Sequence, residues 1–300
     1  MATITPAQRA YLMLGLVMLF WAGNSIVGRA VHDEIPPFTL ALVRWTGALV
    51  LLCPFALRHM IAERAIITRH WRAILLLGLL GIAAFNALLY SGLRHTTAAN
   101  ALLLQALIPP LVLLLGALFF RDRASRAQIA GVALSTLGVV AIVFRSDPMA
   151  IIQLRFGQGD GLILIACLAW AIYTVCLRLR PPLHPASFLF MTFAIGALAM
   201  APLSLGEMRM GATVAWGPPV LAAFAYVALF PSLIAYFLYN SAVAQIGAGA
   251  AGQTISLMPL FGALLAIFLL DEELQAYHIM GMVLILGGVT VAGWKQVRPA

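Results

Sequence analysis

Two stretches of the chain decide its fold: QALIPPLVLLLGALFF, from Gln105 to Phe120, and QTISLMPLFGALLAIFLL, from Gln253 to Leu270. When Pro109 is placed on Pro259, the two stretches read alike at an offset of 150 residues. Each is an apolar run long enough for a membrane, which a helix crosses in about 20 residues. Each also holds a glutamine and a proline, which a regular spanning helix disfavours. The sequence therefore places the same irregular membrane segment twice, half a chain length apart.

The composition indicates a membrane protein with many spans. Of the 300 residues, 63% are hydrophobic and 9% are charged, and the mean hydropathy is +1.01. A soluble fold of this size needs far more polar surface. The net charge of +8 comes almost wholly from arginine, with Lys295 as the only lysine. Most arginines stand between apolar runs, so the lipid bilayer is the expected partner and nucleic acid is not.

The cysteines predict neither a disulfide nor a metal site. All three lie inside apolar runs, form no C-x-x-C pair and are odd in number, as expected of small apolar fillers. They are Cys53, Cys167 and Cys176. No cofactor is expected. The first apolar run, about 11–27, is expected to be a spanning helix and not a signal peptide, because its later part makes a poor cleavage region.

Apolar runs bounded by charges or by Pro/Gly clusters give ten candidate spans. The expected fold class is therefore an all-α membrane protein with ten transmembrane helices. Their connections are short, so no soluble domain is expected and no obligate protein partner is evident. The runs are 10–29, 38–57, 72–92, 97–120, 126–144, 160–179, 186–205, 219–240, 248–270 and 276–294.

The distribution of basic residues predicts the orientation of these spans. With the N-terminus in the cytoplasm, the inner segments hold twelve basic residues and the outer loops hold five; Arg44, inside a span, completes the 18. Cytoplasmic loops carry an excess of Lys and Arg. We therefore expect both termini on the cytoplasmic side.

The repeat extends well beyond the opening stretches. At the offset of 150, GVALSTLGVV from Gly131 falls on GMVLILGGVT from Gly281. Nearer the N-terminus the offset is 149, and Trp21 falls on Trp170. One slip of a single residue reconciles the two registers, so the similarity covers most of both halves.

Each repeat unit holds five helices, which is an odd number. The second unit must therefore enter the membrane from the opposite side, so that 1–147 and 148–300 form two inverted five-helix repeats. Such repeats are usual in secondary transporters, because two equivalent halves can exchange roles as gates. A duplicated structural scaffold without transport is the alternative.

Several motifs resemble a known family. They are LFWAGNSIVGRA in the first span, PPFTLALVRWTGAL in the second, and ANALLLQALIPPLVLLLGALFFRDRASRAQIAGVALSTLGVVAI in the fourth and fifth. With their echoes in the second half, they resemble the drug/metabolite transporter superfamily in its ten-helix form with two EamA-like halves. The resemblance implies a basket-like bundle around a central cavity, with the fifth and tenth helices peripheral. It also implies an exporter of small metabolites.

The prolines of the opening stretches are candidate hinges. A proline inside a spanning helix removes a backbone hydrogen bond and kinks the helix, which is tolerated where protein or a cavity absorbs the freed polar groups. Pro109, Pro110 and Pro259 would bend the fourth and ninth helices, and these two helices would act as equivalent gates. A packing kink without motion is the alternative.

Polar and aromatic residues at mid-helix positions predict the lining of the cavity. Aromatic side chains that each carry one polar group, such as the Tyr hydroxyl or the Trp N–H, suit the binding of amphipathic, partly apolar solutes. The candidate substrate-binding residues are Trp21, Asn24, Arg44, Asn86, Tyr90, Gln105, Trp170, Tyr173, Tyr236, Tyr239, Asn240, Gln253 and Ser256.

An interfacial aromatic belt is the alternative place for some of the rings. Trp45, Trp71, Trp216 and Trp294 stand near predicted helix ends and are expected in the belt. For Tyr90 and Tyr239 the belt and the cavity are equally open.

Arg44 is the one charge well inside a predicted span. It stands six residues past Phe38, about 9 Å along a helix axis. An intramembrane charge costs at least about 2.5 kcal/mol, so it is a functional candidate. It could meet a substrate carboxylate, or its side chain could extend outward to the membrane surface.

The remaining ionisable residues do not indicate ion coupling. Every Asp, Glu and His falls at a predicted helix end or loop, whereas proton-coupled carriers typically bury such a group at mid-membrane. A facilitator fits better. The chain has no Walker A sequence, no H-E-x-x-H motif and no catalytic set at bilayer depth, which disfavours an ATPase and a membrane-embedded enzyme. The repeat speaks against a purely structural assembly protein.

We therefore expect a carrier in the bacterial inner membrane, an exporter by its resemblance. Neutral and aromatic amino acids are the favoured substrates, because the predicted cavity is aromatic, free of acids and has one partner for a carboxylate. Amphipathic drugs or other metabolites are the alternative.

Overall fold

The structure is a computed structural model that describes residues 5–144, 157–270 and 275–297. It is all-helical, with 86% helix and no strand in the described residues. Within these described ranges, nine helical runs are long and apolar enough to cross a membrane, and the last helix adds the shorter apolar stretch Ile279–Gly293. The predicted fold class is confirmed. The elements are α1 (Pro6–Ala30), α2 (Pro37–Ala62), α3 (Arg64–Arg69), α4 (Trp71–Gly78), η1 (Leu79–Ala84), α5 (Phe85–Leu93), α6 (Ala98–Gln105), α7 (Ile108–Phe120), α8 (Arg126–Val143), α10 (Gln158–Cys176), η2 (Leu177–Leu179), α11 (Pro185–Arg209), α12 (Pro218–Ala228), η3 (Leu229–Ile234), α13 (Ala235–Ile246), α14 (Ala248–Gln253), η4 (Thr254–Ser256), α15 (Leu257–Leu270) and α16 (Ala276–Val297).

Several spans differ in detail from the predicted runs. The eighth span, α12–η3–α13, continues to Ile246, six residues past its predicted end at 240. The short helix α3 was not predicted. The predicted boundary between the repeats, at 147/148, lies outside the described residues.

Local sequence explains where helices begin. Thr5 and Gln8 form a capping box at the start of α1, and Ser125 and Gln128 form one at the start of α8. In each box the hydroxyl accepts from the backbone of the third helical residue, and the amide side chain accepts from the cap residue's N–H. These bonds satisfy backbone groups that a helix start leaves free.

The contacts of the peripheral helices show the pseudo-two-fold relation between the halves. A Cβ placed on Gly131 of α8 would lie 2.5 Å from the carbonyl oxygen of Gly288 in α16, and one on Gly138 would lie 2.7 Å from that of Gly281. At the offset of 150, each contact is the image of the other. Only glycine lets two backbones approach this closely.

The fourth and ninth spans meet in the same symmetric way. A Cβ on Gly262 would lie 2.7 Å from a methyl of Leu102, and one on Gly252 would lie 3.2 Å from a methyl of Val112. Because 102 pairs with 252 and 112 with 262, these two contacts also exchange under the repeat.

The fourth and ninth spans are interrupted just before their prolines. The fourth breaks between α6 and α7, and Pro109 and Pro110 then stand in the first turn of α7. The ninth tightens into the 3₁₀ turn η4, and Pro259 follows in the first turn of α15. Proline is well accommodated in a first turn, where its missing N–H costs little.

The third and eighth spans each contain a π-helical segment, η1 and η3, whose bounds lie 150 residues apart. Gly81 stands in the first and Pro231 at the matching place in the second. Such segments frequently occur at functional sites, because they disturb the regular hydrogen bonding of the helix.

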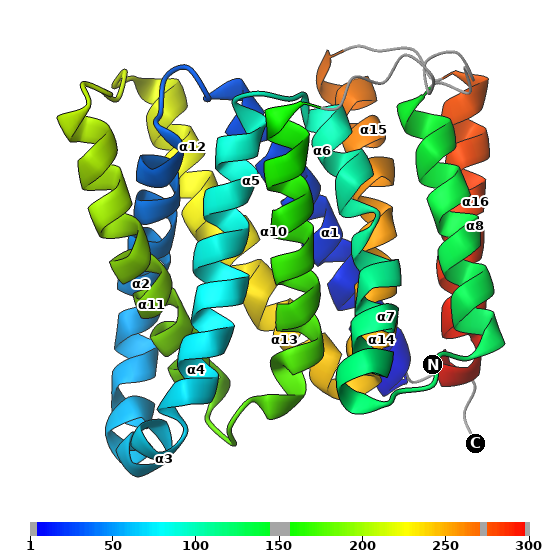
Figure 1. Cartoon of the computed structure of the whole chain (residues 1–300), viewed down its shortest axis with the longest axis horizontal. Helices are drawn as coiled ribbons and strands as arrows, with labels where there is room; N and C mark the ends of the chain where they lie inside the picture. The colour runs from blue at the N-terminus through cyan, green and yellow to red at the C-terminus, as the bar shows by residue number, and fades with distance from the viewer. Residues whose placement is uncertain (1–4, 145–156, 271–274, 298–300) are drawn as a thin grey trace.

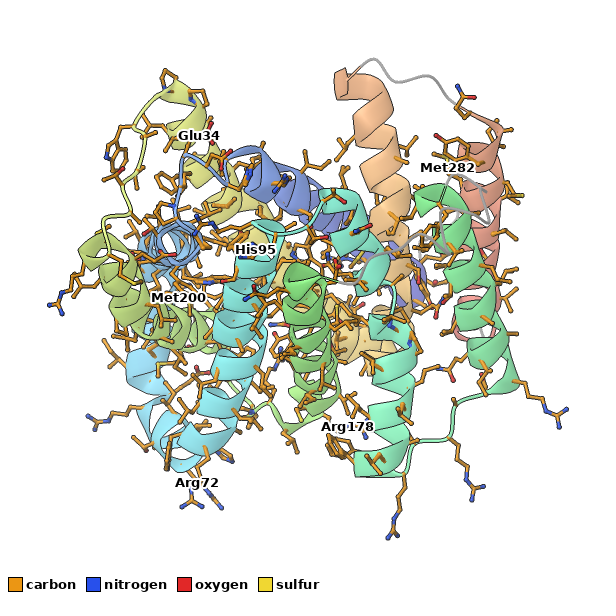
Figure 2. All side chains as sticks on the ribbon, turned by 45° about the horizontal axis from the view of Figure 1, so that its top comes forward. Glu34, Arg72, His95, Arg178, Met200 and Met282 are labelled. Atoms are coloured by element: carbon orange, nitrogen blue, oxygen red, sulfur yellow. The ribbon has the colours of Figure 1, made fainter. Side chains whose placement is uncertain are left out.

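Figure 1 shows α8 and α16 side by side at one end of the bundle, with α1 among the remaining helices. α1 begins and α16 ends at the face of the bundle that also holds α3 and the C-terminal end of α7. In Figure 2, Arg72 and Arg178 lie at the edge opposite Glu34. This is the basket-like arrangement with peripheral fifth and tenth helices that the resemblance implied.

Candidate functional site

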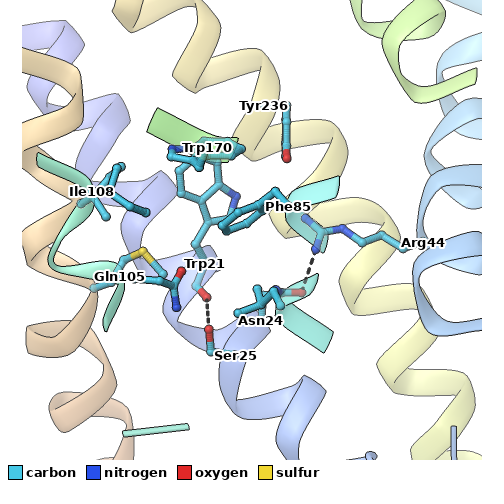
Figure 3. A pocket seen from close by; sticks show the side chains of 12 residues that line it. Trp21, Asn24, Ser25, Arg44, Phe85, Gln105, Ile108, Trp170 and Tyr236 are labelled. Atoms are coloured by element: carbon cyan, nitrogen blue, oxygen red, sulfur yellow. Dashed lines mark hydrogen bonds between the residues drawn. The ribbon is translucent and has the colours of Figure 1, made fainter. Parts of the chain in front are cut away.

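A small cavity lies between the two halves, lined by both. Its volume is about 20 Å³, enough for one or two water molecules. All of its lining residues except Phe85 are buried, so it lies in the interior of the bundle. Figure 3 shows Trp21, Phe85 and Trp170 gathered on one side and Arg44 reaching in from the other. The lining residues are Trp21, Asn24, Ser25, Arg44, Phe85, Leu89, Gln105, Ile108, Trp170, Tyr236, Ile255 and Met258.

The Arg44 side chain is buried, with 2% of its surface exposed. Its Nη1 donates to Asn24 Oδ1 at 3.2 Å, to Asn86 Oδ1 at 2.7 Å and to Tyr90 Oη at 2.8 Å. Tyr90 in turn donates to Asn24 Oδ1 at 2.7 Å. The guanidinium also lies 4.5 Å from the centre of the Trp45 ring, a cation–π distance.

The π-helical segment η3 supplies the other partners of the guanidinium. Pro231 has no N–H for the Val227 carbonyl four residues earlier, and the Ser232 hydroxyl donates to that carbonyl at 2.6 Å. Arg44 Nε donates to the same Ser232 Oγ at 2.5 Å, and Nη2 donates to the Pro231 carbonyl at 3.0 Å. The irregular turn thus provides the polar groups that hold the buried charge.

All of these acceptors are neutral. Among the described residues, the ion pairs join His32 to Asp33 and Arg178 to Asp122, and neither involves Arg44. A buried charge without a counter-ion costs several kcal/mol, which neutral hydrogen bonds only partly offset. The guanidinium is therefore well prepared to receive an anion.

Aromatic rings form the other wall of the cavity. Trp21 and Trp170, which are equivalent in the two repeats, lie edge to face with centroids 4.9 Å apart. Tyr236 packs against both, at 5.8 and 5.6 Å. The irregular backbone again anchors these rings, because Trp21 donates to the Pro231 carbonyl at 3.0 Å and Tyr236 to the Gly81 carbonyl at 2.7 Å.

Six of the predicted site residues line the cavity: Trp21, Asn24, Arg44, Gln105, Trp170 and Tyr236. Asn86 and Tyr90 bind Arg44 instead. The others lie in a second layer or further away. Tyr173 donates to Asn240 at 2.9 Å, Tyr239 contacts the Trp21 ring, Gln253 donates to Ser135 of α8, and Ser256 is buried in η4.

Sequence reasoning missed the remaining lining residues and the role of η3. Leu89, Ile108, Ile255 and Met258 carry no signal that separates them from ordinary apolar residues of a span. Ser232 and Pro231 did carry one, since a proline followed by a hydroxyl in an apolar run marks a disturbed helix with a local replacement donor.

One expectation about side-chain placement is wrong, and one of the two alternatives left open for Arg44 does not hold. Trp45 is fully buried and packs against Phe193 and Tyr236, so it does not belong to an interfacial belt. Arg44 does not extend to the membrane surface. Trp71 and Trp216 are exposed, as a belt requires, and the Trp294 side chain lies outside the described part.

Two buried carboxylates, which lie outside the cavity, accept hydrogen bonds from helix ends and loops. Glu207, in the last turn of α11, accepts from the backbone N–H groups of Phe38 and Thr39 at 3.2 and 3.0 Å. Asp160 accepts from the Thr96 hydroxyl at 2.7 Å and from the Gly157 N–H at 2.9 Å. Both hold helix N-termini or loops, which anions stabilise. The residues that the structure describes contain no His/Cys/Asp/Glu group suited to a metal ion.

Comparison with known proteins now places the chain. The model of the EamA-like transporter family matches residues 8–144 and again residues 157–294. The chain belongs to this family. Its two repeats and its spans are therefore those of an EamA-like transporter, a membrane transporter and not an enzyme.

Relatives across bacteria and archaea have similar length. An "Uncharacterized transporter" of Archaeoglobus fulgidus is 27% identical, over 96% of this chain and 99% of that protein. A "Probable terminal-alkyne amino-acid exporter" of Streptantibioticus cattleyicolor is 26% identical, over 94% and 92%. A crystal structure at 20% identity superposes with a TM-score of 0.74, covering 95% of this chain and 96% of the other, and supports the fold.

Proposed function

We propose that this EamA-like transporter carries neutral and aromatic amino acids, and that Arg44 binds their carboxylate. The observation that carries the proposal is a buried guanidinium with neutral acceptors only, facing an aromatic wall across one cavity. A carboxylate would supply the missing counter-charge, and Trp21, Trp170 and Tyr236 would receive the side chain. The amino-acid exporter among the relatives supports the same class.

Other amphipathic solutes are the second candidate. The lining is mostly aromatic and aliphatic, and such surfaces bind many partly apolar molecules. A drug without an anionic group would use the rings and leave Arg44 with its present partners.

Transport by alternating access would use the fourth and ninth spans as gates. The cavity is too small for an amino acid in the present closed conformation, so the helices around it must separate to admit one. The interruptions ahead of Pro109 and Pro259 are natural hinges, because they already lack regular helix hydrogen bonds. Their symmetric contacts at Gly252 and Gly262 would let the halves exchange roles.

We further propose that the protein lies in a bacterial inner membrane, as an exporter with both termini in the cytoplasm. α1 begins and α16 ends at the face of the bundle that also holds the arginine-rich α3 and the segment after α7 (Figure 1), in keeping with the positive-inside rule. No ion coupling is proposed, since Glu207 and Asp160 are occupied with helix ends and do not line the cavity.

The test is uptake into liposomes that hold only this protein. Labelled phenylalanine, methionine and a control sugar would be offered without any ion gradient, with protein-free liposomes as the blank. We expect both amino acids to enter and the sugar to stay out. Entry only after a pH or sodium gradient is imposed would contradict the uncoupled mechanism, and no entry under any gradient would contradict the substrate class.

A further inference from the structure

The cavity holds an unbalanced set of charges for a zwitterion. Of the twelve lining residues, Arg44 is the only charged one, and the other eleven are neutral. An amino acid brings an ammonium group as well as a carboxylate. Bound beside Arg44, that ammonium would find another cation nearby and only neutral oxygens to accept its hydrogen bonds. The lining of the cavity therefore offers a cation to the carboxylate of an amino acid and no anion to its ammonium group.

The hydrogen bonds of the Arg44 guanidinium show which of its N–H groups could bind a carboxylate. Arginine has five N–H donors. Nε donates to Ser232, Nη1 has three acceptors for its two hydrogens, and Nη2 donates to the Pro231 carbonyl. One hydrogen of Nη2 is thus left for an incoming acceptor. The crowded Nη1 can give up one neutral partner, because Tyr90 and Asn24 are also bonded to each other.

A carboxylate is well suited to this arrangement. Its two oxygens can take hydrogens from both terminal nitrogens at once, and such charge-assisted pairs are about twice as strong as neutral bonds. An ammonium group has donors only and can replace none of the present acceptors of Arg44.

The repeat symmetry gives the bound molecule a direction. At the offset of 149, the position equivalent to Arg44 is Phe193. Phe193 is buried and packs against Trp45 and Tyr236, at 5.0 and 5.8 Å between ring centres. The first half thus places a cation at this position and the second half a ring, and of the two only Arg44 lines the cavity. The cavity therefore has its cation on one side and the rings of Trp21, Trp170 and Tyr236 on the other, which fits a solute with an anionic end and an apolar end.

We propose that the site selects apolar and aromatic monocarboxylates, and that the α-amino group is dispensable. Phenyllactate and similar 2-hydroxy or deaminated acids are then substrates alongside the amino acids. This inference rests on the proposed function and deepens it. It also predicts a difference in charge movement, because the acid crosses as an anion and the amino acid as a neutral zwitterion.

The experiment is competition in the same liposomes. Entry of labelled phenylalanine is measured in competition with three unlabelled compounds. Phenylalanine carries both the carboxylate and the ammonium group, phenyllactate carries only the carboxylate, and 2-phenylethylamine carries only the ammonium group. We expect phenyllactate to inhibit within about threefold of phenylalanine, and phenylethylamine to inhibit at least tenfold more weakly. Preloaded phenyllactate should also accelerate phenylalanine entry, and an inside-positive potential should accelerate only labelled phenyllactate, beyond the protein-free blank.

The outcomes separate this inference from the proposed function. Phenylalanine transport that phenyllactate inhibits more than tenfold less well than phenylalanine would overturn the inference and leave the amino-acid carrier standing. Inhibition by phenylethylamine as strong as that by phenyllactate would also overturn it. Entry of neither phenylalanine nor phenyllactate would overturn both. In Arg44→Gln, the preference for phenyllactate over phenylethylamine should disappear, and its persistence would overturn the role of the guanidinium.

Discussion

The Ser232 hydroxyl joins the irregular turn of the eighth span to the buried charge, and Ser232→Ala tests this link. The hydroxyl donates to the Val227 carbonyl and accepts from Arg44 Nε at 2.5 Å. A hydrogen bond to a charged group contributes about 1.5–3 kcal/mol, and a neutral one about 0.5–1.5 kcal/mol. The substitution should therefore lower the free energy of unfolding by about 2–4.5 kcal/mol, well above the ~0.6 kcal/mol usual between membrane helices.

Ser187 provides a matched control. It is also fully buried, but its hydroxyl has no hydrogen-bond partner. Ser187→Ala should change the free energy of unfolding by less than about 1 kcal/mol or raise it, because a buried unpaired hydroxyl is unfavourable. The assay is reversible unfolding in mixed detergent micelles at increasing SDS fraction, followed by far-UV circular dichroism. Equal effects of the two substitutions would show that the Ser232 hydroxyl does not stabilise the buried Arg44.

Substitutions at two further positions test contacts that lie away from the cavity. Gly131→Leu should destabilise the protein by at least about 1–3 kcal/mol, because its Cβ would meet the Gly288 carbonyl at 2.5 Å. Gly15→Leu is the control, since no atom of another helix or side chain lies within 4 Å of a Cβ placed there. Equal unfolding curves of the two variants would contradict the close contact at Gly131. Glu207→Ala should cost about 1–2 kcal/mol, since the start of α2 loses an acceptor for two N–H groups. Glu207→Gln should cost less, and thermal unfolding that ranks the two in the opposite order would contradict the capping role.

The spans and the repeat could be predicted because they rest on long patterns. Hydropathy over about 20 residues marks each span, and an offset that holds over whole helices cannot arise from one residue type. The prolines at 109 and 259 also stood out, since the repeat gave each a partner. The interruptions in the fourth and ninth spans were therefore predictable in position, though not in form: one is a break between helices and the other a 3₁₀ turn.

The cavity was harder to predict because it depends on rotation of helices and on irregular turns. Arg44 and Trp45 are consecutive, about 100° apart on a helix, and the sequence does not show that both face inward. Trp45 was assigned to a belt from its distance to a helix end, but it packs under the guanidinium. The carbonyls of Gly81 and Pro231, which lie in the π-helical segments, are backbone groups and leave no side-chain signal, although they anchor Tyr236, Trp21 and Arg44.

Carboxylate binding by Arg44 is tested most directly by the ratio of two affinities. Binding of phenylalanine and of its carboxamide would be measured in the purified protein and in Arg44→Gln. Because the ratio is taken within each protein, a general loss of folded protein cancels. A charge-assisted bond of about 1.5–3 kcal/mol corresponds to a roughly 10- to 150-fold preference for the acid. We predict that preference in the native protein and its loss in Arg44→Gln. An unchanged preference in the variant would contradict the account, because the carboxylate would then be bound elsewhere.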